Sequence, residues 1–253
     1  METALNQRDQ AIKTMCRRLH PNTTITPANP QQRHLRTSGQ QVELYHSTCK
    51  CHCRYSTASH VIYSYEDRPS HGCQLCDRGS EAEKAFAAAL VEFNVHKKTK
   101  IYYNLWTRFR GKCRSVDFSL FDDTVRVEID GRQHFKLVPL FNHPGNGFLE
   151  QKARDIQQNV DVLIHEGPCK ILLRTSFTDG TALRAVIAGL MKIVDAAEDS
   201  NLNTLILVGK KTEYEPMGVA TCARLLTMGI PHHTEAIENE DDDTDMWVFV
   251  ACA

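Results

Sequence analysis

The sequence predicts an α/β fold in which helices flank a mixed sheet, with a small Cys/His-rich module ahead of the sheet. Three observations lead to this class. Segments with the two-residue alternation of strands occupy residues 101–130, segments with helical spacing precede and follow them, and five of the ten cysteines fall between residues 49 and 76. With 253 residues, 42% of them apolar, the chain is long enough to bury one large or two small cores.

Composition argues against a membrane span and against secretion. No run of about 18 or more apolar residues occurs, and the first 30 residues are polar where a signal peptide would need an apolar stretch. We therefore expect an intracellular protein with no membrane partner, in a reducing compartment (cytoplasm or nucleus) where clustered cysteines bind metal. Residues 1–115 hold 18 Lys and Arg against 9 Asp and Glu, and residues 116–253 hold 12 against 22. A basic half suits phosphates, and an acidic half suits cations.

In chain order, we expect four parts. Residues 1–45 are predicted to be a mostly flexible leader with one short helix over 9–19, and residues 46–79 form the Cys/His module. Residues 80–178 form the central α/β unit, with helices over 80–93 and 147–159 and strands over 101–106, 115–121, 124–130, 160–164 and 170–174. Residues 179–253 form an α/β extension without a functional signal, with helices over 181–197 and 218–228, strands over 204–208 and 246–250, and an acidic loop over 235–245.

Two alternating segments on either side of Asp122 and Asp123 predict a hairpin with a two-residue turn. In that register, residues whose numbers sum to 245 face each other. Phe118 then pairs with Val127, and the next pair of the same face joins residues 116 and 129.

The polar face of this hairpin carries three carboxylates. Asp117 lies opposite Glu128 in the predicted register, and Asp130 follows on the same face. Opposed like charges destabilise a sheet, so a bound cation or a shared proton must offset their repulsion. Oxygen ligands of this kind suit Mg²⁺ or Mn²⁺. The alternative is an exposed hairpin edge whose carboxylates are screened by water.

Further polar residues flank this cluster in the sequence. Glu83 stands at the capping-box spacing from Ser80, which gives it a structural role, although its side chain could also face the hairpin. His134 is either structural or a base or metal ligand near neutral pH. Arg154 and Asp155 are expected to flank the site on the helix over 147–159.

The Cys/His module offers two ligand pairs for one zinc ion. Cys73 and Cys76 form a CxxC pair just before the helix that starts at Ser80, so a zinc there would anchor that helix and contribute folding energy. The first pair is open from spacing alone. The combinations that suit it are Cys49 with His52, Cys49 with Cys53 and Cys51 with Cys53, and His46, His60 and His71 lie nearby.

A basic and aromatic stretch covers residues 97–114. Its composition suits phosphate neutralisation together with stacking on exposed bases, or equally a first sheet strand with a solvated basic face. The candidates for nucleic-acid contact are Lys97, Lys98, Lys100, Trp106, Arg108 and Arg110.

The order of these motifs resembles the restriction-like PD-(D/E)XK nucleases, and more closely their very-short-patch-repair-like branch with its ExDGxQH block. The pieces are SxxE from Ser80, VDF from Val116, VEIDGRQHF from Val127, KARD from Lys152 and ILLR from Ile171. The resemblance implies a restriction-endonuclease-like sheet, a Mg²⁺ or Mn²⁺ ion held by Asp117 and Glu128 with Glu83 assisting, and hydrolysis of phosphodiester bonds in DNA, RNA remaining open.

This chain departs from the ExK pattern because Asp130 stands where the family has lysine. The role of that lysine, which is to orient or activate the attacking water, would pass to Gln133 or His134. The resemblance also extends to a treble-clef zinc finger, which implies Cys49 and His52 as the first zinc pair. The competing function is a catalytically inactive zinc-finger module that binds nucleic acid on a degraded nuclease fold. The missing lysine favours that module, whereas the enzyme is favoured by the joint presence of Glu83, Asp117, Glu128, Asp130, Gln133 and His134.

Overall fold

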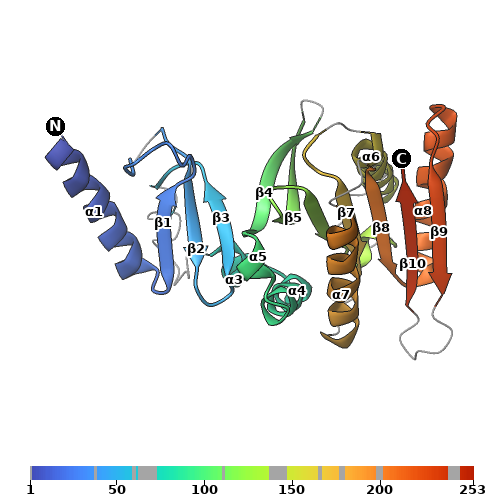
Figure 1. Ribbon diagram of the computed structural model, residues 1–253, viewed down its shortest axis with the longest axis horizontal. Coiled ribbons are helices and arrows are strands. Elements are labelled where there is room, and N and C mark those ends of the chain that lie inside the picture. Colours follow the sequence, from blue (N-terminus) through green and yellow to red (C-terminus); the bar gives the residue numbers. More distant parts are fainter. Residues whose placement is uncertain are drawn as a thin grey trace.

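The computed structural model of this chain consists of a ten-stranded sheet with helices on both of its faces (Figure 1). The structure describes residues 2–36, 39–58, 61, 73–109, 112–136, 147–164, 167–176, 180–197, 202–238 and 246–253. The strand order is β1-β2-β3-β4-β5-β6-β7-β8-β10-β9, so most strands lie beside their neighbours in the sequence. The α/β class and the mixed sheet flanked by helices are thus confirmed.

The first three strands form an antiparallel meander at one edge of the sheet, namely β1 (Thr23–Pro27), β2 (Val42–His46) and β3 (Cys51–Tyr55). Helix α1 (Glu2–Leu19) packs beside β1 and buries Ile12 and Cys16. This differs from the mostly flexible leader expected for residues 1–45. The segment is rich in polar residues, but its short strands need only a few apolar side chains to pack, and Ile25 and Leu44 supply them.

The middle of the sheet carries the predicted hairpin. Strand β4 (Ile101–Phe109) runs parallel to β3 and antiparallel to β5 (Lys112–Leu120), which pairs antiparallel with β6 (Val125–Ile129). Phe118 pairs with Val127, which confirms the predicted register. Asp122 and Asp123 have φ angles of 53° and 73°, as the two central residues of a hairpin turn of this length require.

Three parallel strands follow and bring the chain to the far edge. Strands β6, β7 (Ile171–Thr175) and β8 (Thr204–Gly209) run parallel, and β10 (Trp247–Cys252) and β9 (His233–Glu238) add antiparallel to β8. Every residue of β7 and β8 is buried, as expected for strands with helices on both sides.

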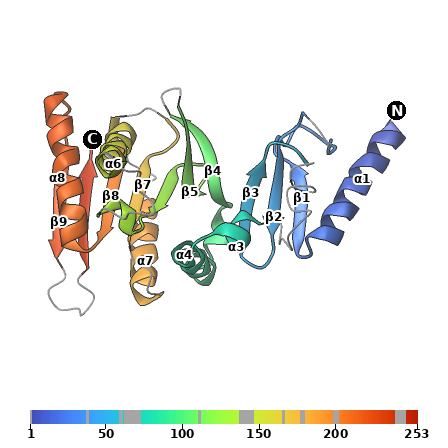
Figure 2. The same cartoon turned by 180° about the vertical axis from the view of Figure 1, so that it is seen from behind.

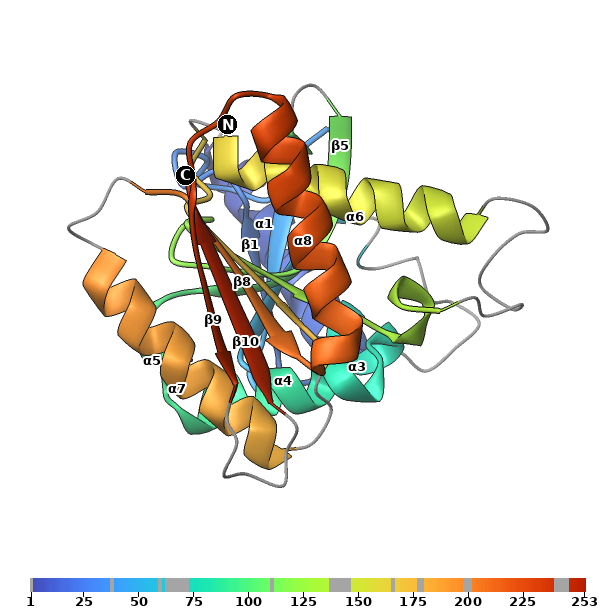
Figure 3. The same ribbon diagram turned by 90° about the vertical axis from the view of Figure 1, so that its right-hand side faces the viewer.

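Two helix pairs cover the two faces of this sheet (Figures 2 and 3). Helices α4 (Glu81–Glu92) and α7 (Gly180–Ala197) contact each other on one face, and α6 (Gly147–Ile164) and α8 (Lys211–Thr227) contact each other on the other. The shorter helices are α3 (Gln74–Arg78), α5 (Val95–Lys98) and the 3₁₀ turn η1 (Arg132–His134). None of the helices in the described ranges combines the length and apolar surface that a bilayer-spanning helix requires.

Each face has its own apolar core. Beneath α4 and α7, Phe86 and Leu183 pack with alternate strand residues such as Val127 and Leu173. Beneath α6 and α8, the core includes Val160, Leu163, Leu172, Leu205, Leu207, Tyr214 and Leu225.

Three predictions about helices, strands and loops are wrong. The strand expected over 160–164 is the last part of α6, because a short apolar run on a buried helix cannot be told from a strand by periodicity. Helix α8 begins at Lys211 rather than at residue 218, with Pro216 inside it. Residues 235–238 of the expected acidic loop belong to β9, and residues 239–245 lie outside the described residues.

Candidate functional site

One cavity of about 750 Å³ gathers the residues expected at the carboxylate site. Its lining includes Glu83, Asp117, Glu128, Asp130, Gln133 and His134, together with Ser176, Lys210 and Glu213. Asp130, Ser176 and Lys210 each follow directly after one of the parallel strands β6, β7 and β8. Ligands of α/β sheets bind outside the carboxyl ends of such strands, so the cavity has the usual position of a site in this fold class.

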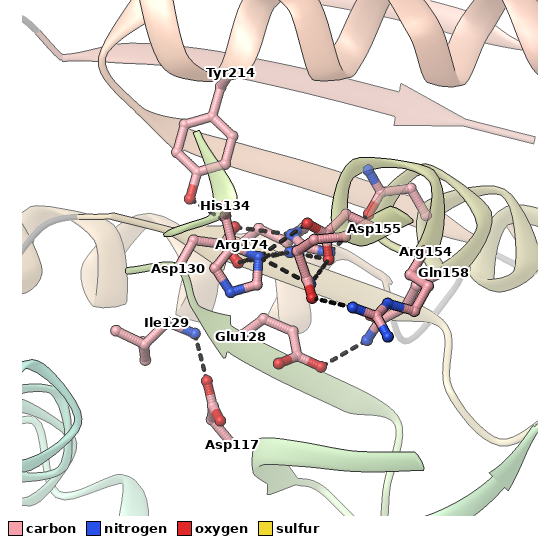
Figure 4. Close-up of polar contacts among 12 residues, drawn as sticks. Asp117, Glu128, Ile129, Asp130, His134, Arg154, Asp155, Gln158, Arg174 and Tyr214 are labelled. Carbon is pink, nitrogen blue, oxygen red and sulfur yellow. Dashed lines mark hydrogen bonds and ion pairs between the residues drawn. The ribbon is translucent and has the colours of Figure 1, made fainter. Parts of the chain in front are cut away.

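Asp117 occupies a gap between two strands. The β5–β6 ladder ends at the Phe118–Val127 pair. The further pairs expected between Asp117 and Glu128 and between residues 116 and 129 are not part of it. Instead, the backbone N–H of Ile129 donates a hydrogen bond to Asp117 Oδ2 at 2.7 Å (Figure 4). The side chain therefore takes up a donor that the sheet ladder would otherwise use, and it lies where β5 and β6 separate.

Glu128 is held from the opposite side by helix α6. Gln158 Nε2 donates to Glu128 Oε1 at 2.6 Å, as Figure 4 shows. Arg154 and Asp155 were expected from the sequence to flank the site from this helix, whereas Gln158 was not. Gln158 stands one turn beyond Arg154, so the helical period would have marked it as a neighbour on the same face.

The two carboxyl groups favour protonation in this environment. Burial raises the pKa of Asp117, and the negative charges of Glu83 and Asp130 raise it further, against the opposing effect of the Ile129 N–H. Burial and the charge of Asp117 also raise the pKa of Glu128. A divalent cation would offset this repulsion, and the oxygen donors fit Mg²⁺ or Mn²⁺.

Glu83 has both of the roles considered for it. Its backbone N–H donates to Ser80 Oγ at 3.2 Å and its carboxylate accepts from the Ser80 N–H at 2.5 Å, which completes the capping box of α4. The other carboxylate oxygen accepts from the Tyr103 hydroxyl at 3.0 Å. The side chain also lines the cavity, so one residue both starts the helix and faces the carboxylates.

Asp130 forms a buried ion pair. Arg174 Nε and Nη2 donate to its two carboxylate oxygens at 2.9 and 2.6 Å, and the Tyr214 hydroxyl donates to Oδ2 at 2.9 Å. The Arg174 and Asp130 side chains are each 1% exposed. Because the guanidinium binds both oxygens, the Asp130 carboxylate stabilises the floor of the cavity and is not free to bind a metal ion. The sequence analysis missed Arg174 and Tyr214 as partners, since they come from β7 and α8.

His134 lies between two carboxylates beside this ion pair. Its Nδ1 is 2.9 Å from Asp155 Oδ2 and 3.4 Å from Asp130 Oδ1. Burial lowers the pKa of His134, but the bond with Asp155 and the charge of Asp130 outweigh burial and leave that pKa raised. Neighbouring Gln133 folds back over Gly131, so a side chain at position 131 would require the Gln133 amide to shift.

Lys210 is the functional candidate that sequence reasoning missed. It follows β8, is the N-cap residue of α8, and lines the cavity with the carboxylates. The sequence analysis placed a strand over 204–208 but began the next helix at 218, which left Lys210 in an unassigned segment. The position after a buried parallel strand was the signal that could have identified it.

The Cys/His module converges on a second candidate metal centre. The ligand atoms of His46, Cys49, Cys73 and Cys76 all lie within 4.8 Å of one another. His46 Nδ1 is 3.3 Å from Cys49 Sγ and 3.4 Å from Cys76 Sγ, and Cys49 Sγ is 3.5 Å from Cys73 Sγ. A tetrahedral ion with Zn–S bonds of about 2.3 Å places its sulfur ligands roughly 3.8 Å apart, so these four residues could hold a metal such as zinc.

Without a cation, the thiols of this cluster favour the protonated form at neutral pH. Hydrogen bonding with Cys51, together with burial, raises the pKa of Cys49 to about 12. Burial and the nearby Cys49 raise the pKa of Cys76 to about 11. A bound metal would stabilise the thiolate forms, as zinc sites do.

His52, expected as a zinc ligand from the family resemblance, lies elsewhere. Its Nδ1 is 2.8 Å from Glu43 Oε1, whereas His46 takes the fourth position of the cluster. His46 and Cys49 have the same spacing as Cys49 and His52, so spacing could not separate the two pairs. Cys53 lies 4.0 Å from Cys73 but outside the group of four. His60 and His71 fall outside the described residues.

The basic stretch divides into exposed and internally paired residues. The Trp106 side chain is 67% exposed, so the ring is available at the surface and is not part of a core. Lys97 is exposed, and the exposed Lys98 lies 3.9 Å from Asp195. Arg108 lies in β4 without a described side chain, and residue 110 falls outside the described residues.

Lys100 differs from its basic neighbours because it donates to Glu43 Oε1 at 2.9 Å. Burial alone would raise the pKa of Glu43, but hydrogen bonds with His52, Lys100 and Tyr102 lower it to about 2. Lys100 thus neutralises a buried carboxylate, and this contact competes with its predicted contact to nucleic acid.

No family model, curated protein or solved structure matches this chain.

We predict that His46→Ala lowers zinc affinity sharply, whereas His52→Ala leaves it unchanged. His46 contributes a donor atom to the cluster and His52 pairs with Glu43. Elemental analysis after dialysis should find about one zinc per chain in the wild type and in His52→Ala, as a four-ligand site holds one ion. Loss of zinc from His52→Ala with retention in His46→Ala would reverse the assignment.

The raised pKa values of Asp117 and Glu128 predict a pH-dependent loss of stability without divalent metal. Above the ordinary carboxyl pKa near 4, the unfolded chain releases protons that folded Asp117 and Glu128 retain. Their contribution to the free energy of unfolding therefore falls as pH rises from about 4 through the raised folded pKa values, with a slope for each group of about 1.4 kcal/mol per pH unit. Asp117→Asn should remove part of this fall and raise stability at neutral pH.

Urea unfolding at a series of pH values, with a chelator present, measures this difference. The matched control is Asp122→Asn in the exposed hairpin turn, which should leave the pH profile unchanged. A profile for Asp117→Asn that follows the wild type at every pH would contradict the prediction.

Proposed function

We propose that this protein is a metal-dependent endonuclease that hydrolyses phosphodiester bonds in DNA, with a zinc module ahead of the nuclease core. The observation that carries the proposal is the cavity at the carboxyl ends of β6, β7 and β8, which Asp117, Glu128 and Lys210 all line. The sequence order of the family resemblance and this spatial convergence support the same reaction from independent directions.

Asp117 and Glu128 are the residues that would hold Mg²⁺ or Mn²⁺. They approach from β5 and β6, and because their pKa values are raised, a bound cation would favour the ionised form of both at neutral pH. A divalent cation bound there would polarise a scissile phosphate and lower the pKa of a bound water. Glu83 adds a further negative charge from α4, which increases the attraction for such a cation.

Lys210 supplies the positive charge that the ExK position lacks in this chain. Asp130 stands at that position and is neutralised by Arg174, so it cannot take the lysine's role. Lys210 reaches the same cavity from the N-terminus of α8 and would orient the attacking water or the phosphate. Gln133 and His134 line the cavity as well, and the raised pKa of His134 favours a proton donor over a base.

His46, Cys49, Cys73 and Cys76 form the proposed structural zinc site. The ligands come from the β2–β3 hairpin and from the start of α3, an arrangement that supports the expected treble-clef-like finger. Only two residues separate the end of α3 from the start of α4, and the second of them, Ser80, lines the cavity, so the finger lies directly beside the carboxylate cavity.

The competing function is a nucleic-acid-binding module without catalysis. It is favoured by the exposed Trp106 and Lys97 beside a zinc module, because these features need no reaction. The two functions differ in a single observable, which is metal-dependent cutting.

Lys210→Ala and Glu128→Gln should each reduce Mg²⁺-dependent nicking of plasmid DNA by about 100-fold or more, because each removes a charge that would act on the reacting groups in the proposed mechanism. Gel analysis of supercoiled plasmid with and without Mg²⁺ measures the rate. Lys211→Ala is the matched control, since it removes the same charge from the next position on α8, outside the cavity lining. Wild-type protein that binds DNA but never cuts it would leave the binding module as the function.

Trp106→Ala should weaken binding to single-stranded or distorted DNA by about 1 to 3 kcal/mol, as expected for loss of one stacked base. Because the ring is exposed, the free energy of unfolding should stay within about 0.5 kcal/mol of the wild type. Fluorescence anisotropy with a labelled oligonucleotide measures the affinity. Trp106→Tyr should restore most of it, and unchanged binding by Trp106→Ala would exclude this strand as the contact surface.

A further inference from the structure

Asn104 has an unusual backbone conformation in the middle of strand β4. Its φ angle is 51°, in the left-handed region that strand residues do not adopt. Asparagine tolerates this region better than other non-glycine residues, but a left-handed residue inside a strand still rotates the chain.

The rotation coincides with the position of Asp117 on the neighbouring strand. The β4–β5 ladder pairs Tyr103 with Phe118 and Leu105 with Val116, and at the level between these two pairs it has none. Residues 116 and 118 should share one face of the sheet, because strand side chains alternate. Instead the Phe118 ring lies 5.2 Å from Phe86 of α4, while Val116 packs with Tyr102 and Leu105 in a separate cluster. The alternation of side chains between the two faces of the sheet is therefore interrupted in β4 at Asn104 and in β5 at Asp117.

The side chain of Asn104 connects this rotation to the Cys/His cluster. Asn104 Nδ2 donates to Gln74 Oε1 at 3.1 Å. Gln74 stands on α3 between Cys73 and Cys76, which are two of the four candidate metal ligands. Tyr103, next to Asn104, donates to Glu83. Two adjacent residues of β4 thus contact α3, which carries two of the candidate metal ligands, and Glu83 of α4. The same residues lie beside Asp117 on the neighbouring strand.

We propose that Asn104 is a positioning residue that makes the carboxylate site depend on the Cys/His metal centre. Metal at the cluster fixes α3 and therefore Gln74, which holds Asn104 in its left-handed conformation. The resulting rotation of β4 and β5 directs Asp117 into the gap beside β6, where it accepts from the Ile129 N–H. The zinc module then serves as more than a fold anchor, because it sets the geometry of a second cation site. The inference rests on the proposed function for the identity of the two metals.

Amide hydrogen exchange at Ile129 tests this link directly, because that N–H is held by the Asp117 carboxylate. In zinc-loaded protein, Asn104→Ala and Gln74→Ala should each accelerate Ile129 exchange by at least tenfold and weaken Mn²⁺ binding in a calorimetric titration by a similar factor. Chelation of zinc should have the same effect in the wild type. Asn104→Gly permits the left-handed backbone but has no amide, so Ile129 exchange in this variant should no longer respond to zinc.

Asn94→Ala is the matched control. Asn94 has a φ angle of 56°, close to that of Asn104, but it caps the short helix α5 and does not contact Gln74. The Asn94→Ala substitution introduces the same backbone strain at another position. The rate of Ile129 exchange and its dependence on zinc should therefore remain as in the wild type.

Ile129 exchange that is unchanged in both Asn104→Ala and Gln74→Ala would overturn the link, and so would an equal acceleration in Asn94→Ala. If chelation unfolds the protein, the zinc-loaded Gln74→Ala variant still decides the question, because it alters no metal ligand. Wild-type protein that binds no Mn²⁺, with Ile129 exchange that still depends on Asn104, would reject the proposed function and support the link.

Discussion

The buried ion pair between Arg174 and Asp130 joins five elements beside the cavity, which are β6, β7, α6, α8 and η1. Arg174 comes from β7 and Asp130 from the end of β6, and their partners are Tyr214 on α8, Asp155 on α6 and His134 in η1. Removing one partner of such a pair typically costs about 3 to 5 kcal/mol, because the remaining charge stays buried without compensation. Since helices α6 and α8 approach the site through this pair, the positions of Gln158 and Lys210 depend on it as well.

The carboxyl groups of Asp117 and Glu128 differ in their electrostatic state from those of Asp130 and Asp155. Asp130 is fully compensated, and Asp155 has its pKa lowered by His134 and Arg174 against the effect of burial. Asp117 and Glu128 have raised pKa values and no cationic side chain in direct contact among the described residues. A compensated group stabilises the fold, whereas an uncompensated pair favours the binding of a positive charge, which a metal ion can supply. This division separates the structural carboxylates from the candidate ligands, even for Glu128 and Asp130, which stand only two positions apart.

Local patterns in the chain were sufficient for the parts of the fold that depend on neighbouring residues. The hairpin register, the turn at Asp122 and Asp123, and the capping box of Ser80 and Glu83 all involve contacts across a few positions. Most helices and strands after residue 80 were also expected, within a few residues at their ends. The failures occurred where a local pattern fits two structures, as in the apolar run at the end of α6, or where polar composition hides short strands, as in β1 and β2.

From sequence alone it was determined that this chain is an α/β protein with a carboxylate-bearing hairpin and a cysteine pair suited to metal. Residue type, alternation and spacing are properties of the chain itself, and they limit which chemistry is available. Only the tertiary structure decided that His46 rather than His52 joins the cysteines, that Arg174 neutralises Asp130, and that Lys210 lines the same cavity as the carboxylates. These outcomes depend on which distant segments pack together, and equal spacings or isolated charges carry no information about that packing.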